Sequence, residues 1–304
     1  MAEHEFEMLD DRFRLCIRTS ARLDRLAGDC RWAEGPVYSP AGRYLVWSDI
    51  PNDRMMRWDE TTGAVGVFRQ PAGYTNGSTM DRLGRMVSCE QGGRRITRTE
   101  HDGSLTVLAD RYQGKRFNSP NDVVVRADQS IWFTDPSYGI DSDYEGDRAD
   151  SEIGGCHVYR IDPVSGACAI VADDFVRPNG LAFSPDERLL YIADSGGTSV
   201  KDGPRHIRRF RVDEHSQLAG GEVFATCTAG FFDGMRLDEF GRIWTSANDG
   251  VHCYDPDGTL LGKVFVPERV ANVVFGGVRR NRLFICATSS IYAMLLPVRG
   301  AKTF

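Results

Sequence analysis

One pattern recurs six times along the chain: two short apolar runs joined by a polar turn. The turns are rich in Gly, Asp, Asn or Arg, and the second runs are heavy in β-branched or aromatic residues, which favours β-hairpins. A third strand-like run follows every hairpin, and a fourth follows five of the six. Four strands per unit, repeated at spacings of about forty to sixty residues, are typical of a β-propeller. We therefore predict an all-β fold of six four-stranded antiparallel blades, whose first hairpins span residues 33–49, 75–90, 120–135, 178–194, 232–248 and 271–288.

The two ends of the repeat array predict how the ring of blades closes. The last unit stops after its third run at residues 291–296, whereas an unassigned strand-like piece, ARLDRLA at 21–27, precedes the first unit. We expect this piece to form the outer strand of the last blade, which leaves no open edge there. The alternative is a set of unrelated hairpins in a sandwich or in two small domains. No linker rich in Pro, Ser or Gly divides the chain, so we predict an N-terminal extension (1–20) and one domain (21–304).

The charge and the cysteine pattern exclude several classes of protein. The 304 residues carry a formal charge of −6, which argues against a nucleic-acid partner, because such proteins gather Lys and Arg on one face. No apolar run is long enough to span a membrane, and the start of the chain lacks a signal-peptide pattern, so we expect a cytoplasmic protein without a membrane partner. The eight cysteines form no CxxC pair and the six histidines no HExxH motif. This predicts reduced core thiols and excludes a zinc site built on Cys or His.

Each predicted first strand carries a polar residue at the same position of the repeat. In a propeller the first strands line a central channel, so equivalent side chains form one ring around the axis. Carboxylates mixed with amides, without Cys or His, suit one hard divalent cation, with Ca²⁺ first and Mg²⁺, Mn²⁺ or Zn²⁺ as alternatives. A channel filled with hydrogen-bonded water is the other interpretation, since Asn and Asp also favour turns for local reasons. The ring residues are Glu34, Asn76, Asn121, Asn179, Asp233 and Asn272.

Acidic residues end four of the predicted second strands. Antiparallel geometry places these ends on the same face as the ring, one step further from the axis. There they either tune the site or are solvated, and we expect solvation for at least two of them. The four residues are Asp49, Glu90, Asp135 and Asp194.

Two long loops are also predicted on this face, because they join a second strand to a third. They span residues 136–155 and 195–205. Long insertions beside a site commonly form lids or substrate walls, although the acidic half of the first one is also a candidate for disorder. Tyr138 and Lys201 are the residues that we expect to contact a substrate.

Five motifs in chain order, AEGPVY, NSPNDVVV, IWFTDPSYG, RPNGLAFSPD and FFDGMRLDEFGRIW, give the sequence a family resemblance. The chain resembles regucalcin (senescence marker protein) and the gluconolactonases, and the bacterial gluconolactonases most closely, from about residue 25 to residue 298. The resemblance implies a six-bladed propeller with one divalent cation in its channel.

The resemblance also implies roles for ring residues. It makes Glu34, Asn179 and Asp233 metal ligands, with Asp233 also the general base. Asn121 would be a fourth ligand, as in related fluorophosphatases, or a contact to substrate or metal-bound water, as in animal lactonases. Animal members carry an arginine two places before this asparagine, where the present chain has Ser119. Sugar recognition must therefore differ in detail, and no fixed family role is assigned to Asn76 and Asn272.

The expected activity is hydrolysis of a small-molecule sugar lactone, with D-glucono-1,5-lactone as the best single substrate. The cation would act as a Lewis acid on the carbonyl, while Asp233 takes a proton from the attacking water. Two alternatives stay open: hydrolysis of a phosphotriester or fluorophosphate at the same site, and a propeller that binds calcium without catalysis. A condensing enzyme of the strictosidine-synthase type would share the fold but is not expected to keep this set of ring residues. The sequence does not indicate an oligomeric state.

Overall fold

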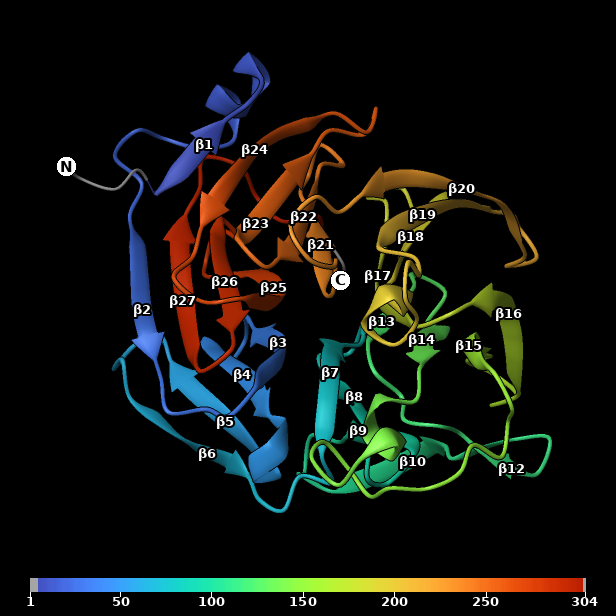
Figure 1. Cartoon of the computed structure of the whole chain (residues 1–304). Helices are drawn as coiled ribbons and strands as arrows, with labels where there is room; N and C mark the ends of the chain where they lie inside the picture. The colour runs from blue at the N-terminus through green and yellow to red at the C-terminus, as the bar shows by residue number, and fades with distance from the viewer. Residues whose placement is uncertain (1–4, 303–304) are drawn as a thin grey trace.

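Six antiparallel sheets stand around a common axis in the computed structural model, which describes residues 5–302 (Figure 1). The innermost strand of each sheet is the first of its predicted unit, and strands follow outward in chain order. The all-β, six-bladed prediction is confirmed. The inner strands are β3 (Ala33–Ser39), β7 (Thr75–Met80), β13 (Val123–Val125), β17 (Pro178–Phe183), β21 (Met235–Leu237) and β25 (Val270–Gly276).

The remaining strands complete the blades in the same order. The second strands are β4 (Tyr44–Asp49), β8 (Met86–Glu90), β14 (Ile131–Asp135), β18 (Leu189–Asp194), β22 (Ile243–Ala247) and β26 (Arg282–Ala287). The third strands are β5 (Arg54–Asp59), β9 (Arg95–Thr99), β15 (Cys156–Ile161), β19 (His206–Val212), β23 (Gly250–Tyr254) and β27 (Ser290–Leu295). The outer strands of the first five blades are β6 (Val65–Arg69), β10 (Leu105–Ala109), β16 (Cys168–Phe175), β20 (Leu218–Thr226) and β24 (Leu260–Phe265). A small hairpin, β11 (Arg111–Tyr112) and β12 (Lys115–Arg116), follows the second blade.

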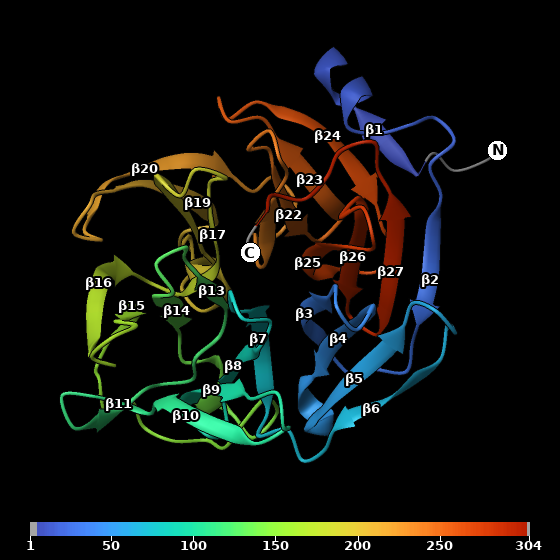
Figure 2. The ribbon, with the colours of Figure 1, turned by 180° about the vertical axis from the view of Figure 1, so that it is seen from behind.

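The last blade is closed by a strand from the start of the chain, as predicted. β2 (Leu23–Ala27) pairs antiparallel with β27, with Leu23 opposite Met294. Both views show β2 beside β27 (Figures 1 and 2). β27, the third strand of the last unit, therefore pairs with a strand from the start of the chain, because its own unit has no fourth strand.

Residues before β2 add a further strand to the fifth blade, which the sequence analysis did not predict. β1 (Phe6–Met8) pairs with β24, with Phe6 opposite Val264. The following 3-10 helix η1 (Asp11–Leu15) buries Phe13 completely. Three residues are too few to show the alternation of apolar and polar side chains that predicts a strand. β1 is a strand because it pairs with the open edge of β24. The division into an extension and one domain stays a prediction.

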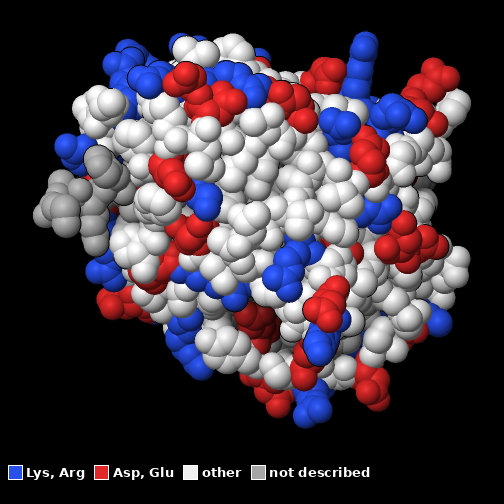
Figure 3. Space-filling model, turned by 45° about the horizontal axis from the view of Figure 1, so that its top comes forward, with Lys and Arg blue, Asp and Glu red and all other residues white. Residues whose placement is uncertain are grey.

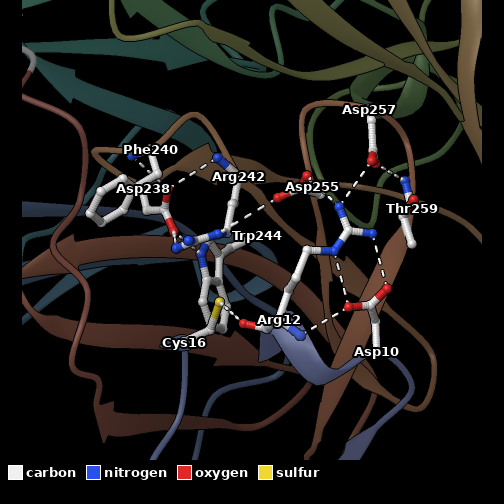
Figure 4. A network of polar contacts seen from close by, with 10 residues as sticks. All are labelled: Asp10, Arg12, Cys16, Asp238, Phe240, Arg242, Trp244, Asp255, Asp257 and Thr259. Carbon is white, nitrogen blue, oxygen red and sulfur yellow. Dashed lines mark hydrogen bonds and ion pairs between the residues drawn. The ribbon is translucent and has the colours of Figure 1, made fainter. Parts of the chain in front are cut away.

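A charged network ties η1 to the fifth blade (Figure 4). The Arg12 guanidinium donates to Asp10 on its own segment and, through Nη1, to Asp255 at 2.8 Å and Asp257 at 2.9 Å. Nearby, the Phe13 ring lies 6.2 Å from the Trp244 ring, between centroids. The ring takes the space beside Gly262, where a Cβ would lie 2.5 Å from Phe13 Cδ1.

Phe13→Ala should lower the free energy of unfolding by about 3–5 kcal/mol, the usual cost of emptying a buried aromatic site. Leu15→Ala in the same short helix is the matched control, because Leu15 is 66% exposed and its truncation should change little. Denaturant unfolding of both variants measures the difference. Equal effects of the two substitutions would show that the N-terminal segment does not contribute to the core.

The core and the surface fit the composition. All eight cysteines are free thiols, and six of them are buried, which agrees with the predicted reduced core. Basic and acidic side chains are interspersed on the face in Figure 3. Within residues 5–302, no helix has the length and apolar character needed to cross a membrane.

Candidate active site

Several first strands contain a β-bulge next to their ring residue. In the first blade Glu34 is opposite Ser48, but the next aligned pair is Val37 with Val46, so the inner strand holds one extra residue. The same irregularity lies between Thr75 and Ser78 and between Pro178 and Leu181. A bulge bends its strand locally and re-aims a side chain. Five of the six ring residues are at most 6% exposed: Glu34, Asn76, Asn121, Asn179 and Asn272, while Asp233 is partly buried.

Glycine after the ring residue lets neighbouring first strands meet near the axis. The N–H of Gly180 donates to the carbonyl of Asp233 at 3.0 Å, and a Cβ on Gly180 would lie 2.2 Å from that oxygen. The N–H of Gly77 likewise donates to the carbonyl of Asn121 at 2.7 Å. Any larger residue would force these blades apart. The ring is therefore held by backbone contacts between blades.

Three acids at the ends of second strands hold the backbone that leads to the ring. Asp49 accepts from the N–H of Arg31 at 2.8 Å, and Asp135 accepts from those of Asn118 at 2.8 Å and Ser119 at 2.9 Å. Each donor lies two or three residues before a ring residue. The fourth blade repeats the arrangement, with Asp194 accepting from the N–H groups of Val176, Arg177 and Gly196.

The expectation that at least two of these acids are solvated is wrong. Asp49 and Asp135 are fully buried, and Asp194 and Glu90 are no more than 3% exposed. Buried N–H groups need acceptors, and the ends of the second strands are within reach of them. Glu90 differs from the other three, because it accepts from the Arg95 side chain at 2.7 Å and from Thr97 Oγ1 at 3.0 Å.

Asp194→Ala should lower the free energy of unfolding by about 2–5 kcal/mol, because three backbone donors near the site lose their acceptor. Asp173→Ala, at an exposed position of neighbouring β16, is the control and should have little effect. Thermal and denaturant unfolding measure both. Similar stabilities of the two variants would mean that water replaces the Asp194 carboxylate without cost.

The two ring carboxylates interact electrostatically. Burial raises the pKa of Glu34, and the charge of Asp233 raises it further. Glu34 Oε2 accepts from the N–H of Gly35 at 2.7 Å and from Asn272 Nδ2 at 3.1 Å. Burial raises the pKa of Asp233 to about 7, although Arg269 and a hydrogen bond from Asn179 oppose the shift. Glu34, Asn179 and Asp233 thus come together, as the sequence predicted, whereas the roles assigned to them stay predictions.

A third buried carboxylate, Asp122, lies close to the ring and was missed by the sequence analysis. It is 1% exposed, and its charge raises the pKa of both Glu34 and Asp233. Arg236 Nη1 lies 3.4 Å from Asp122 Oδ2 across the channel. A signal was present, because four ring residues are followed by Gly, whereas Asn121 is followed by this acid.

The two long loops meet through Tyr138. The helix α1 (Tyr138–Asp141) opens the first insertion, and Tyr138 Oη lies 3.0 Å from Thr198 Oγ1 in the second, beside the 3-10 helix η3 (Gly196–Thr198). Burial raises the pKa of Tyr138 to about 12, and the charge of Asp233 adds to the shift. Lys201 is exposed, and none of the contacts described within residues 5–302 brings it to a ring residue.

Asn121 and Asn179 differ in their partners. Asn179 Nδ2 donates to Ser195 Oγ at 3.3 Å, and that hydroxyl donates to the carbonyl of Phe232 at 2.6 Å. Among the described residues the Asn121 side chain has no hydrogen-bond partner, although the residue is only 6% exposed. An amide oxygen in this position is available to a ligand.

The donor set fits a hard divalent cation. Residues 5–302 contain no group of three His, Cys, Asp or Glu side chains that could hold a metal, but the predicted set has only two carboxylates beside its amides. Glu34 is buried and the charge of Asp233 acts on it, so two like charges share a site where a positive partner would stabilise both. A cation there would be such a partner, and oxygen donors of this kind are those that Ca²⁺ and Mg²⁺ prefer.

The opposite end of the channel is different in character. It opens into a cavity of about 110 Å³, lined by the far halves of the same inner strands, including Val37, Val124 and Leu237. Charged side chains, among them Glu187 and Arg236, also line this cavity.

The fold and the ring together define a six-bladed propeller with carboxylates and amides at one end of its channel, and comparison with known proteins gives the family. The model of the SMP-30/gluconolactonase/LRE-like region matches residues 32–289. The chain belongs to this family, which confirms the resemblance drawn from the motifs.

Relatives cover nearly the whole chain. A gluconolactonase from Zymomonas mobilis is 30% identical over 92% of this chain and 83% of its own length, and a pentonolactonase from Haloferax volcanii is 30% identical over 84% and 81%. The solved structure of a gluconolactonase from Xanthomonas campestris is 37% identical, with a TM-score of 0.90 over 96% of this chain and 95% of that chain.

Proposed function

We propose that this protein hydrolyses a sugar lactone, with D-glucono-1,5-lactone as its best substrate. The observation that carries the proposal is that Glu34, Asn179 and Asp233, which come from three different blades, meet at one end of the channel. A carboxylate held there can take a proton from a water molecule. The relatives at 30% to 37% identity are named as lactonases, which supports the same reaction class.

Glu34, Asn121, Asn179 and Asp233 would hold one divalent cation, for which we propose Ca²⁺. When bound, the cation supplies Lewis-acid polarisation of the lactone carbonyl and offsets oxyanion charge. Asp233 accepts a proton from the water that attacks the carbonyl carbon. The bond from that carbon to the ring oxygen then breaks, and the ring oxygen receives a proton to become a hydroxyl group. Tyr138, which joins the two long loops through Thr198, would border the substrate and exclude water from that side.

The test is a comparison of turnover numbers on D-glucono-1,5-lactone and on a paraoxon-like phosphotriester, before and after chelation. We expect the lactone to be the better substrate, and activity to disappear with chelation and return with Ca²⁺. Greater efficiency on the phosphotriester would assign the site to that chemistry. Calcium binding without turnover of either compound would leave a non-catalytic propeller.

A further inference from the structure

The first insertion is anchored at both sides of the channel mouth. On the third blade, Ser119 Oγ accepts from the N–H of Gly139 at 2.9 Å, and Gly146 packs so closely on Gly139 that a Cβ would lie 2.3 Å from its carbonyl oxygen. On the first blade, the Arg31 guanidinium lies 5.0 Å from the centroid of the Tyr144 ring. The insertion thus reaches from the third blade to the first, and one residue separates Tyr144 from Gly146.

That residue is Glu145, which is partly buried. Burial raises its pKa to about 7, with a further contribution from the charge of Asp233, while Arg269 opposes the shift. The charges of Asp233, from the fifth blade, and of Arg269, before the sixth, thus both act on the Glu145 carboxylate. Arg269 stacks over Trp32 at 5.2 Å. Within the described residues Glu145 has no hydrogen-bond or ion-pair partner, so its acceptor oxygens are available at the mouth.

Ser119 anchors the start of this insertion to the third blade. Its hydroxyl donates to the carbonyl of Pro136 at 2.6 Å as well as accepting from Gly139. A Cβ on Gly139 would lie 2.9 Å from the Ser119 Cβ, so α1 occupies the space that a longer side chain at position 119 would need. Ser119 therefore fastens the loop that carries Glu145.

We propose that Glu145 binds the substrate directly, its carboxylate accepting hydrogen bonds from two neighbouring hydroxyl groups of a polyhydroxylated lactone. The inference rests on the proposed function and adds the residue that selects sugar lactones over plain ones. A carboxylate presents two acceptor oxygens side by side, which matches a pair of adjacent hydroxyl donors. Charge-assisted hydrogen bonds of this kind are the strong ones, so selectivity should depend on this one side chain.

Two lactones with the same six-membered ring test the inference: D-glucono-1,5-lactone and δ-valerolactone, which has no hydroxyl groups. Glu145→Ala should lower kcat/KM on gluconolactone by about 10-fold or more, mainly through KM, because charged hydrogen bonds are lost. Its kcat/KM on δ-valerolactone should stay within about twofold of wild type, since that substrate offers no hydroxyl donor. Asp147→Asn, an exposed acid two residues on, is the matched control and should leave both substrates unaffected.

The outcomes separate the two ideas. Wild-type turnover of gluconolactone with an unchanged Glu145→Ala variant overturns the role of Glu145 and leaves the proposed function standing. Equal losses on both substrates also overturn it, because they indicate a misplaced insertion rather than lost hydroxyl contacts. If the wild type hydrolyses neither lactone, the proposed function is wrong and the inference falls with it.

Discussion

Asp233→Asn should lower kcat on D-glucono-1,5-lactone by about 10²–10⁴-fold, the usual contribution of a general base. The amide is nearly the same size as the carboxylate but cannot take the proton from water. The backbone should stay in place, because the contact of Asp233 with Gly180 is made by its carbonyl oxygen. The measurement is initial rates at saturating Ca²⁺, which separates a lost base from a weakened metal ligand.

Asp202→Asn, an exposed acid in the second long loop, is the control for this substitution. It removes the same charge from a loop on the same face without touching the ring, so its rate should match the wild type. Retention of more than a tenth of the wild-type kcat by Asp233→Asn, with the cation bound, would remove Asp233 from the role of base. Asp122 would then be the next carboxylate at the ring to examine.

Repetition made most of the fold predictable. A strand of three residues such as β21 has little pattern of its own, yet its place is fixed by equivalence with the five other inner strands. The same equivalence brought Glu34, Asn179 and Asp233 together. β1 was not predictable in this way, because it belongs to no repeat and is defined by the edge of β24.

The missed site residues share a different cause. Asp122 departs from the repeat at a position where glycine is the rule, so the departure itself was the available signal. Glu145 lies in an insertion, where no equivalent position exists in other blades. Asp49, Asp135 and Asp194 were placed on the correct face but given the wrong environment, because sequence position does not show which backbone donors a carboxylate will meet.

Glu34 should make the stability of the metal-free protein fall as the pH rises above about 4, where an unfolded glutamate releases its proton. The pKa of Glu34 is raised in the folded protein by burial and by Asp233, whereas an unfolded glutamate titrates near 4. The folded state therefore keeps a proton that the unfolded state has already released. The contribution of Glu34 to the free energy of unfolding is fully present at pH values below the unfolded pKa. It is lost as the pH rises through the folded pKa. The side chain of Glu34→Gln is neutral at every pH. The difference in the free energy of unfolding between the wild type and this variant, measured by denaturant unfolding with chelator present, therefore isolates the effect of Glu34.

A divalent cation should reverse this loss, and should do so most at high pH. Binding at about one hundred times Kd adds about 3 kcal/mol to the free energy of unfolding. Protons compete for the same carboxylates, so the shift in Tm caused by Ca²⁺ should be larger at pH 8 than at pH 5. Glu34→Gln should lose most of that shift, whereas Glu214→Gln, whose side chain is 87% exposed, should keep it. A shift of equal size at both pH values, or one that survives Glu34→Gln, would place the cation away from the ring, because only a ligand set containing Glu34 links metal binding to this proton.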